Sequence, residues 1–203
     1  MKTYMLALLA LSAAFVPVRL PAQVNLVQNG SFGGGFNNGP SGWTSSGVGL
    51  FLGYAGEAAE GDVNFANIEG GGFLYQYLDT IPGQIYDLRF AMAGNINWPG
   101  LITMNTLWDG NNVRMTTWNP TGHTFTNLGW IYTDVEVLAT SSLTQLEFEN
   151  LGQAEQQPFL DAVSVTIVPE ASTSKLLGTI ALPAFLLFRR SRADSKVSHY
   201  YVL

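Results

Sequence analysis

Apolar and polar residues alternate along much of the chain between residues 23 and 167. In the segment 84–93, every second residue from Tyr86 to Met92 is apolar, and the residues between them include Asp87 and Arg89. The side chains of a β-strand point to its two faces in turn, so this pattern predicts a strand with one buried face. Seven further segments have the length and composition of strands: 63–68, 73–78, 101–108, 113–118, 129–137, 143–149 and 159–167.

Turn-forming residues separate these segments, and helical periodicity is almost absent. The sequence Trp-Asp-Gly-Asn-Asn-Val at 108–113 predicts the tip of a hairpin, because Gly and Asn tolerate the positive φ of tight turns. Eight or nine short strands at this spacing predict an all-β fold for residues 23–167, an antiparallel β-sandwich. The chain has 12 Phe, 8 Tyr and 5 Trp, which can fill the core of such a sandwich.

The N-terminus has the pattern of a secretory signal peptide. An apolar run at 4–18 follows the single early cation Lys2, and small residues come after it. We therefore expect a signal helix within residues 1–22, with cleavage between Ala22 and Gln23. Cleavage after Ala14 is the alternative site, and a buried core helix is the alternative structure.

The C-terminus carries a second apolar run, LLGTIALPAFLLF at 176–188. Counted from Ser172 it gives 17 residues, whereas a membrane-spanning helix needs about 20. Cations follow the run at Arg189, Arg190 and Arg192, and only Lys175 precedes it. The excess of cations after the run places the tail 193–203 in the cytoplasm. We expect a short transmembrane helix.

The sequence Val168-Pro169-Glu170, the apolar run and the Arg cluster follow one another in this order. This order resembles the bacterial PEP-CTERM sorting signal, the three-part tail that an exosortase reads. The match covers residues 168–192 and implies that the signal residues are Val168, Pro169, Glu170, Arg189, Arg190 and Arg192. It also implies export across the inner membrane of a Gram-negative bacterium, with an exosortase as partner. Ala171 stands where the family usually has Pro, and residues 193–203 follow the Arg cluster, so a plain membrane anchor is the alternative.

Charge and cysteine content exclude several classes of function. Between residues 23 and 167 the only cations are Arg89 and Arg114, against thirteen carboxylates, so the formal charge of this part is −11. Nucleic-acid binding needs clustered cations and is therefore excluded for this domain. The absence of Cys excludes a thiol nucleophile, a thiolate metal site and a disulfide framework.

Several segments of the middle part resemble galactose-binding-like jelly rolls, in family order. They are Asn25–Phe32, Gly42-Trp43, Ala58–Gly61, Pro82–Asn95, Asn127–Trp130 and Leu160–Val165. Together they are similar to the bacterial choice-of-anchor C domain over residues 25–167. The resemblance implies a jelly roll whose opening strand lies at 25–32. Domains of this kind commonly end in a PEP-CTERM tail.

Related jelly rolls often hold a structural Ca²⁺ near the joined termini. The resemblance implies ligands from an acidic residue after Asn-Gly-Ser-Phe and from an Asp of the closing strand. Here the first position is Gly33, which leaves Asp161 as the candidate metal ligand. Ca²⁺ takes six to eight oxygens, so one carboxylate would make a weak site. The alternative is that Asp161 accepts backbone amides, and we expect no other cofactor.

Tryptophans are the natural candidates for stacking on sugars, because an aromatic face packs on the apolar face of a pyranose. Trp98 lies in the amide-rich loop 95–100, and Trp118 precedes Asn-Pro, so we predict that these two bind carbohydrate as exposed loop residues. Ordinary packing is the alternative for both. Trp43 and Trp130 belong to the family motifs and are expected in the core.

No catalytic residue is predicted. Glu147 and Glu149 share one side of a strand and read as a solvated face, whereas a glycosidase needs two carboxyls across a cleft. His123 reads as a turn residue, since no nucleophile elbow accompanies it.

We therefore expect an exported, non-enzymatic protein of the cell surface or extracellular matrix that carries an exosortase sorting signal. The alternative is a carbohydrate-binding module that recognises an extracellular polysaccharide. A glycan-active enzyme is the third hypothesis, and the arrangement of carboxylates disfavours it.

Overall fold

The computed structural model describes residues 23–33, 40–52, 58–59 and 64–169, and the chain separates after Ile167 into two compact units. The expected signal helix, the apolar run 176–188 and the Arg cluster lie outside the described residues. None of the described residues forms a helix long and apolar enough to cross a membrane. The described strands are β1 (Thr44–Leu52), β2 (Asn64–Asp79), β3 (Ile85–Gly94), β4 (Ile102–Trp108), β5 (Asn111–Trp118), β6 (Ile131–Leu138), β7 (Leu143–Glu149) and β8 (Pro158–Ile167).

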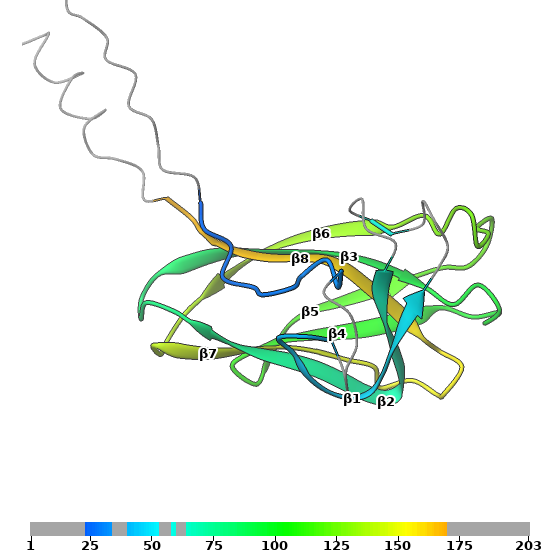
Figure 1. The fold of residues 1–203 in the computed structure, drawn as a ribbon, viewed down its shortest axis with the longest axis horizontal. Helices are drawn as coiled ribbons and strands as arrows, with labels where there is room; N and C mark the ends of the chain where they lie inside the picture. Colours follow the sequence, from blue (N-terminus) through cyan, green and yellow to red (C-terminus); the bar gives the residue numbers. More distant parts are fainter. Residues whose placement is uncertain (1–22, 34–39, 53–57, 60–63, 170–203) are drawn as a thin grey trace, which may run out of the picture. The chain divides into compact units, whose positions relative to one another are not determined.

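The strands form two layers that β2 joins (Figure 1). One layer runs β8, β3, β6, and the other runs β7, β4, β5, with antiparallel pairing throughout. The first half of β2 pairs with β8 at Ala66 and Asn67, and its second half pairs with β7 from Phe73 to Asp79. Strand β1 pairs with β2 along both halves. The predicted antiparallel sandwich is confirmed.

The crossing of β2 between the layers occurs at its Glu-Gly-Gly-Gly segment, 69–72. Gly71 has φ +74°, a conformation that side chains other than Gly rarely adopt. Asn150 holds the bend and is only 1% exposed. Its side-chain Nδ2 donates to the carbonyl of Ile68 at 3.0 Å, and its backbone N–H donates to the carbonyl of Gly72 at 2.9 Å. A buried amide therefore satisfies the backbone where the strand ladder is interrupted.

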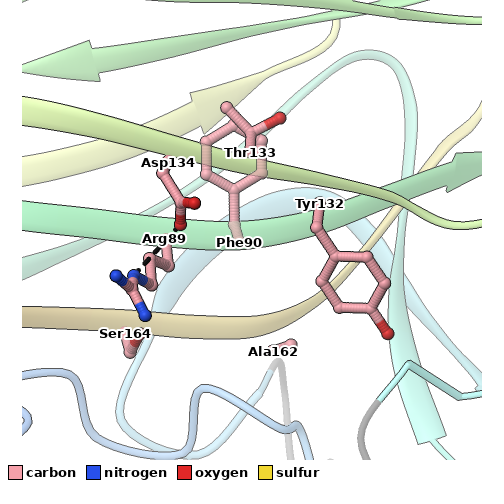
Figure 2. A pocket seen from close by; sticks show the side chains of 7 residues that line it. All are labelled: Arg89, Phe90, Tyr132, Thr133, Asp134, Ala162 and Ser164. Carbon is pink, nitrogen blue, oxygen red and sulfur yellow. Dashed lines mark ion pairs between the residues drawn. The ribbon is translucent and has the colours of Figure 1, made fainter.

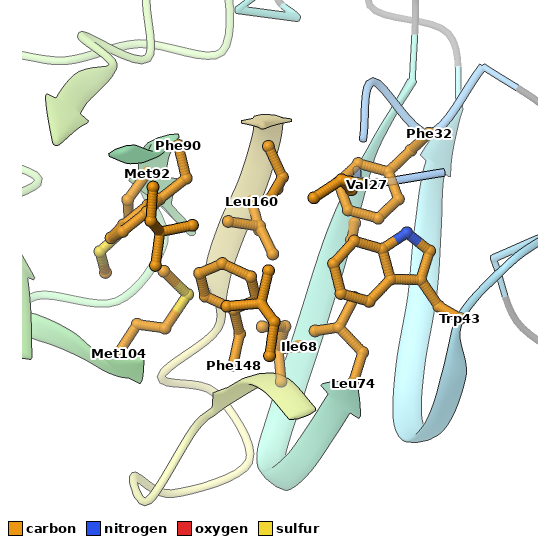
Figure 3. Close-up of a cluster of buried hydrophobic side chains, with 14 of the residues drawn as sticks. Val27, Phe32, Trp43, Ile68, Leu74, Phe90, Met92, Met104, Phe148 and Leu160 are labelled. Carbon is orange, nitrogen blue, oxygen red and sulfur yellow. The ribbon is translucent and has the colours of Figure 1, made fainter. Parts of the chain in front are cut away.

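The core fills the space between the layers (Figure 3). Phe90 of β3 meets Phe148 of β7 edge-on with ring centroids 5.2 Å apart, and Tyr86 lies 6.2 Å from Trp108 of β4. Trp43, just before β1, packs on Phe148 at 6.2 Å. These contacts bury the inward-pointing side chains of both layers, as alternation along the strands requires.

Each of the eight segments predicted from alternation and composition overlaps a strand of the structure. The segments 63–68 and 73–78 are the two halves of β2 rather than separate strands. The hairpin tip is confirmed, because Asp109 and Gly110 connect β4 to β5 with φ +51° and +75°. Strand β1 was not predicted, since its sequence Thr-Ser-Ser-Gly-Val-Gly-Leu lacks a regular alternation.

The predicted opening strand at 25–32 is wrong in its geometry. The segment runs beside β8, where Gly30 accepts the N–H of Val163 at 3.0 Å, but it forms no regular strand. Positive φ angles at Asn29 (+51°) and Phe32 (+56°) interrupt the extended backbone.

Gln76 ties this N-terminal segment to β2 from inside the fold. Its side chain accepts from the backbone N–H of Gln28 at 2.8 Å and donates to the carbonyl of the same residue at 3.0 Å. The same amide also donates to the carbonyl of Gly42 at 2.8 Å. With three hydrogen bonds, a side chain that is only 7% exposed is well satisfied.

Candidate functional site

Three aromatic side chains line the outer surface of β2. Phe73, Tyr75 and Tyr77 point outward because the alternate residues, including Leu74 and Leu78, are buried in the core. The rings of Phe73 and Tyr75 are nearly parallel with centroids 6.2 Å apart, and Tyr77 meets Tyr75 edge-on at 5.6 Å. Tyr77 is 57% exposed and the other two rings are half-buried. The row forms a continuous aromatic strip along the strand.

Polar side chains of β7 flank this strip, because partners in an antiparallel pair share one face. The register pairs Phe73 with Glu149, Tyr75 with Glu147 and Tyr77 with Gln145. On the next strand, β4, Asn105 is the partner of Glu149 and donates to its Oε1 at 3.2 Å. We call these seven residues (Phe73, Tyr75, Tyr77, Asn105, Gln145, Glu147 and Glu149) the aromatic–acidic face.

The carboxylates of Glu147 and Glu149 give the aromatic–acidic face a negative charge. Burial raises the pKa of Glu147, and the neighbouring charge of Glu149 raises that pKa further. The two cations between residues 23 and 167 are not part of this face. Arg89 is on β3 in the other layer. Arg114 of β5 is paired with the buried Thr106 of β4, so it lies on the opposite side of the sheet from Asn105. The described part of the face therefore offers hydrogen-bond acceptors and amides, and it repels anionic ligands.

Aromatic strips beside carboxylates and amides suit ligands that combine apolar surfaces with hydroxyl groups. Ring faces stack on apolar surfaces, and carboxylate oxygens accept hydrogen bonds from hydroxyls. Glu147 and Glu149 occupy alternate positions on one strand, so they do not face each other across a cleft as a glycosidase pair does. They lie on an outer face as expected, but both are half-buried rather than fully solvated. The arrangement can hold an extended ligand along β2, and it lacks the geometry of acid–base hydrolysis.

The expectation that Trp118 is exposed is wrong. Its side chain is 1% exposed, its indole N–H donates to the carbonyl of Leu128 at 3.0 Å, and its ring stacks on His123 at 5.3 Å. The last residues of β5 alternate, and Trp118 shares the inward direction of the buried Thr116. Trp118 therefore presents no face to a sugar and belongs to the core.

The other tryptophans differ in their surroundings. Trp98 is half-buried against the core in the loop between β3 and β4, and its buried indole nitrogen has no hydrogen-bond partner. A sugar-binding role for Trp98 stays a prediction. Trp43 is a core residue as expected, at 8% exposure. Trp130 is half-buried and packs edge-on against Phe65 at 5.4 Å.

Sequence reasoning did not single out Tyr75 and Tyr77. The signal was present, because the sequence Phe-Leu-Tyr-Gln-Tyr-Leu at 73–78 places aromatic residues at every second position. Leu74 and Leu78, at the alternate positions, are also apolar. The sequence therefore did not show whether the aromatic side chains or the leucines face the core.

Asp161 is fully buried in β8. Its two carboxylate oxygens accept the backbone N–H groups of Ala59 at 2.7 Å and Ala162 at 2.8 Å. Within the described ranges, no three His, Asp or Glu side chains gather as a metal site would require. Asp161 thus accepts backbone amides, which is the alternative to a metal-ligand role. The calcium site stays a prediction, and residues 34–39 and 60–63 lie outside the described part of the chain.

The remaining predicted residues lie at the ends or in a turn. His123 follows a turn in which its backbone N–H donates to the carbonyl of Pro120 at 3.0 Å, which confirms its expected position. Gln23 is exposed, and its side chain bonds to the carbonyl of Ile167. Val168 and Pro169 are described without regular structure. Ala22 and the signal residues Glu170, Arg189, Arg190 and Arg192 lie outside the described residues.

A hollow of about 360 Å³ opens on the outer surface of the other layer (Figure 2). Arg89 of β3, Tyr132 and Asp134 of β6, and Ser164 of β8 contribute to its lining. It is separate from the aromatic–acidic face, because the two features lie on different layers of the sandwich.

No known family profile and no curated protein matches the sequence. Solved structures do share the fold. The carbohydrate-binding module TmCBM61, solved with β-1,4-galactotriose, is 19% identical with a TM-score of 0.53, and the match covers 71% of this chain and 99% of that one. The CBM22-1 xylan-binding domain of Xyn10C from Paenibacillus barcinonensis is 16% identical with a TM-score of 0.55, covering 74% and 98%.

A cyclase from Fischerella sp. TAU, solved with 4-(1H-indol-3-yl)butan-2-one, is also similar, at 18% identity and a TM-score of 0.51. That match covers 72% of this chain and 98% of the cyclase. Both binding modules and an enzyme thus occur among the neighbours, so the fold alone does not separate binding from catalysis. The described domain shares the β-sandwich fold of these carbohydrate-binding modules and of the cyclase.

Proposed function

We propose that this domain binds an extracellular polysaccharide through the aromatic–acidic face. The observation that carries the proposal is the register of β2 and β7, which sets each ring of the strip beside a polar side chain. An extended glycan presents the matching pattern, with apolar ring faces and hydroxyl groups repeated along its length. The structural neighbours that bind galactotriose and xylan support a glycan as the ligand class.

The ligand of this proposal is a neutral polysaccharide. The face carries Glu147 and Glu149, and its described residues include no cation. A uronate or sulfate group would lie close to these carboxylates and be repelled, whereas hydroxyl groups would donate hydrogen bonds to them. The charge of −11 between residues 23 and 167 acts in the same direction over a longer range.

Calorimetric titration with soluble xylan and β-1,4-galactan tests the proposal. We expect Tyr75→Ala and Tyr77→Ala each to weaken binding about tenfold, because roughly 60–80 Å² of apolar contact is lost. Ile81→Ala is the matched control, because Ile81 is also 57% exposed but lies outside the face. Equal affinity of the tyrosine variants and the control would contradict the proposal, as would a failure to bind either glycan.

Catalysis is not part of the proposed function. The carboxylates of the face stand at alternate positions of one strand, which does not match the opposed pair that glycoside hydrolysis uses. The cyclase among the neighbours keeps an enzyme as the competing hypothesis. Release of reducing ends from xylan or β-1,4-galactan by the purified chain would favour a glycan-active enzyme.

We also propose that the chain is exported and handled by an exosortase. The apolar run at 4–18 and the ordered tail of Val168-Pro169-Glu170, apolar residues and Arg cluster support this proposal. We expect cleavage near Pro169-Glu170, which would release or re-anchor the domain outside the inner membrane as a surface or matrix protein. Mass spectrometry of the mature protein is the test. Retention of residues 171–203 would indicate a plain membrane anchor.

A further inference from the structure

The hollow on the outer surface of β3, β6 and β8 results from a bulge in β8. Arg89 is paired with Ser164 and Ala91 with Asp161, so two residues of β8 lie opposite the single residue Phe90. Ala162 within the bulge has φ +55°, and the side chain of Asp161 stabilises this conformation by accepting the Ala162 N–H at 2.8 Å. Bulges of this kind redirect side chains and often border binding sites.

Tyr132 forms one wall of the hollow. It is 64% exposed on β6, and its hydroxyl donates to the carbonyl of Ala59 at 3.0 Å. The N–H of Ala59 is in turn held by the buried carboxylate of Asp161 at 2.7 Å. The ring is therefore anchored at its far end while much of its surface remains open. A ring fixed in this way can stack on a ligand at a low cost in side-chain entropy.

The opposite wall is polar and preorganised. The Nη2 of Arg89 lies 2.7 Å from Asp87 Oδ2, and its Nε lies 3.0 Å from Asp134 Oδ1. Figure 2 shows the Arg89–Asp134 pair and Ser164 gathered on one side of the hollow, with the Tyr132 ring on the other. Two carboxylates orient one guanidinium, whose Nε also donates to Asp87 Oδ2 at 2.8 Å. Arg89 supplies donors and the carboxylates supply acceptors, and these three side chains together carry a net charge of one negative unit.

We propose that this hollow is a second binding site, which takes the neutral, hydroxyl-rich end of a saccharide. The volume of about 360 Å³ lies at the small end of the range for small-molecule sites, so it suits one or two sugar rings rather than an extended chain. The Tyr132 ring stacks on the apolar face of the terminal sugar. Arg89 donates to its hydroxyl oxygens, and Asp134 and Ser164 accept from its hydroxyl groups.

This site goes beyond the proposed function, because it lies on a different layer of the sandwich. It would bind the terminal sugars of a saccharide, whereas the aromatic–acidic face would bind an extended polysaccharide chain. Its residues belong to β3, β6 and β8, whereas the aromatic–acidic face belongs to β2, β7 and β4. One domain could then contact two glycan chains on its two outer surfaces. Binding at the hollow does not depend on binding at the face.

Titration of the full-length chain in mild detergent with galactose, xylose and β-1,4-galactotriose tests the site, with nuclear magnetic resonance to locate the contact. We expect at least one of these sugars to bind and to shift the Tyr132 ring and Ser164 amide signals. Ser164→Phe fills the hollow and should weaken this binding about tenfold or more, and Tyr132→Ala should do so by removing the stacking wall. Ile81→Ala, at an exposed position outside both the hollow and the aromatic–acidic face, should leave it unchanged.

Tyr132→Phe separates stacking from a structural role of the tyrosine. This variant keeps the ring but removes the hydrogen bond to Ala59, so we expect it to retain most of the small-sugar affinity. Xylan and β-1,4-galactan binding at the aromatic–acidic face should be unaffected by Ser164→Phe. The site is refuted if none of the three sugars binds at millimolar concentrations, or if Ser164→Phe binds them as well as the unmodified chain.

Discussion

The two faces of the second half of β2 come from the same six residues but differ in role. The inner face carries Leu74, Gln76 and Leu78, all 7% exposed or less, and the outer face carries Phe73, Tyr75 and Tyr77. Hydrophobicity alone would favour the aromatic residues inside and the glutamine outside. The structure reverses this, because Gln76 forms two hydrogen bonds to Gln28 and one to Gly42, and the rings are left to form a surface strip.

Residue type alone therefore does not identify which side chains of this sandwich lie on its surface. Of the two tryptophans predicted to bind sugar, Trp118 points inward and is 1% exposed, whereas Tyr75 and Tyr77, which were not predicted to bind, point outward. Whether a side chain lies in the core or on the surface depends on whether it occupies an odd or an even position along its strand.

The largest effect is expected from Trp118→Ala, compared with Tyr77→Ala. Removal of the buried Trp118 should lower the free energy of unfolding by about 3–5 kcal/mol, because it leaves a cavity and an unpaired Leu128 carbonyl. Tyr77→Ala should change it by about 0.5 kcal/mol or less, as exposed positions do. Urea unfolding of the fragment 23–167, which we expect to fold alone as an all-β monomer, measures both. Similar losses in the two variants would remove the distinction between the faces.

Gln76→Leu should destabilise the fold by about 1–3 kcal/mol, although it makes the inner face more apolar. The substitution leaves the Gln28 N–H and the carbonyls of Gln28 and Gly42 without their partner, and unpaired buried groups are costly. Gln145→Leu on the outer face is the matched control and should be nearly neutral. Hydrogen exchange should show faster exchange at Gln28 only in the first variant. A stabilised Gln76→Leu protein would contradict the role of this tether.

Neutralising the carboxylates of the aromatic–acidic face should alter ligand selectivity. In the double variant Glu147→Gln, Glu149→Gln, we expect the preference for xylan over an acidic polysaccharide to narrow by about fivefold or less at low salt. Salt should narrow the same gap in the unmodified chain by screening. Affinity electrophoresis in gels that contain each polysaccharide measures this. Tighter binding of acidic glycans by the unmodified chain would place the ligand elsewhere.

The smallest effect concerns the pH dependence of stability. The folded-state pKa of Glu147 is raised, chiefly by burial and also by Glu149, so the folded state binds more protons than the unfolded state in the window above pH 4.5. The free energy of unfolding should therefore fall as the pH rises through this window. Glu147→Gln should remove that decrease and raise the thermal midpoint slightly at pH 7. An unchanged pH profile in this variant would show that the carboxyl is not desolvated.

Much of the fold could be predicted from alternation and turn residues. The segments around Leu88, Met104 and Leu146 were assigned as strands, and the Asp109-Gly110 turn was located, because these signals are local. The merging of two predicted strands into β2 could not be predicted. The Glu-Gly-Gly-Gly segment reads as a turn in sequence, and only the contact with Asn150 shows that the strand continues across it.

Strand periodicity, the excess of negative charge and the absence of cysteine can all be read from the sequence alone. The packing of the strands sets which of the two alternating faces of each strand is buried. Tyr75 and Tyr77 therefore lie on the surface, and Trp118 lies in the interior. The tertiary structure also set Tyr75 beside Glu147 and opened the hollow at the bulge of β8. Alternation along a strand divides its residues between two faces, but it does not show which face is buried when both carry apolar residues. Pairing register and backbone irregularities depend on partners that are distant in the chain.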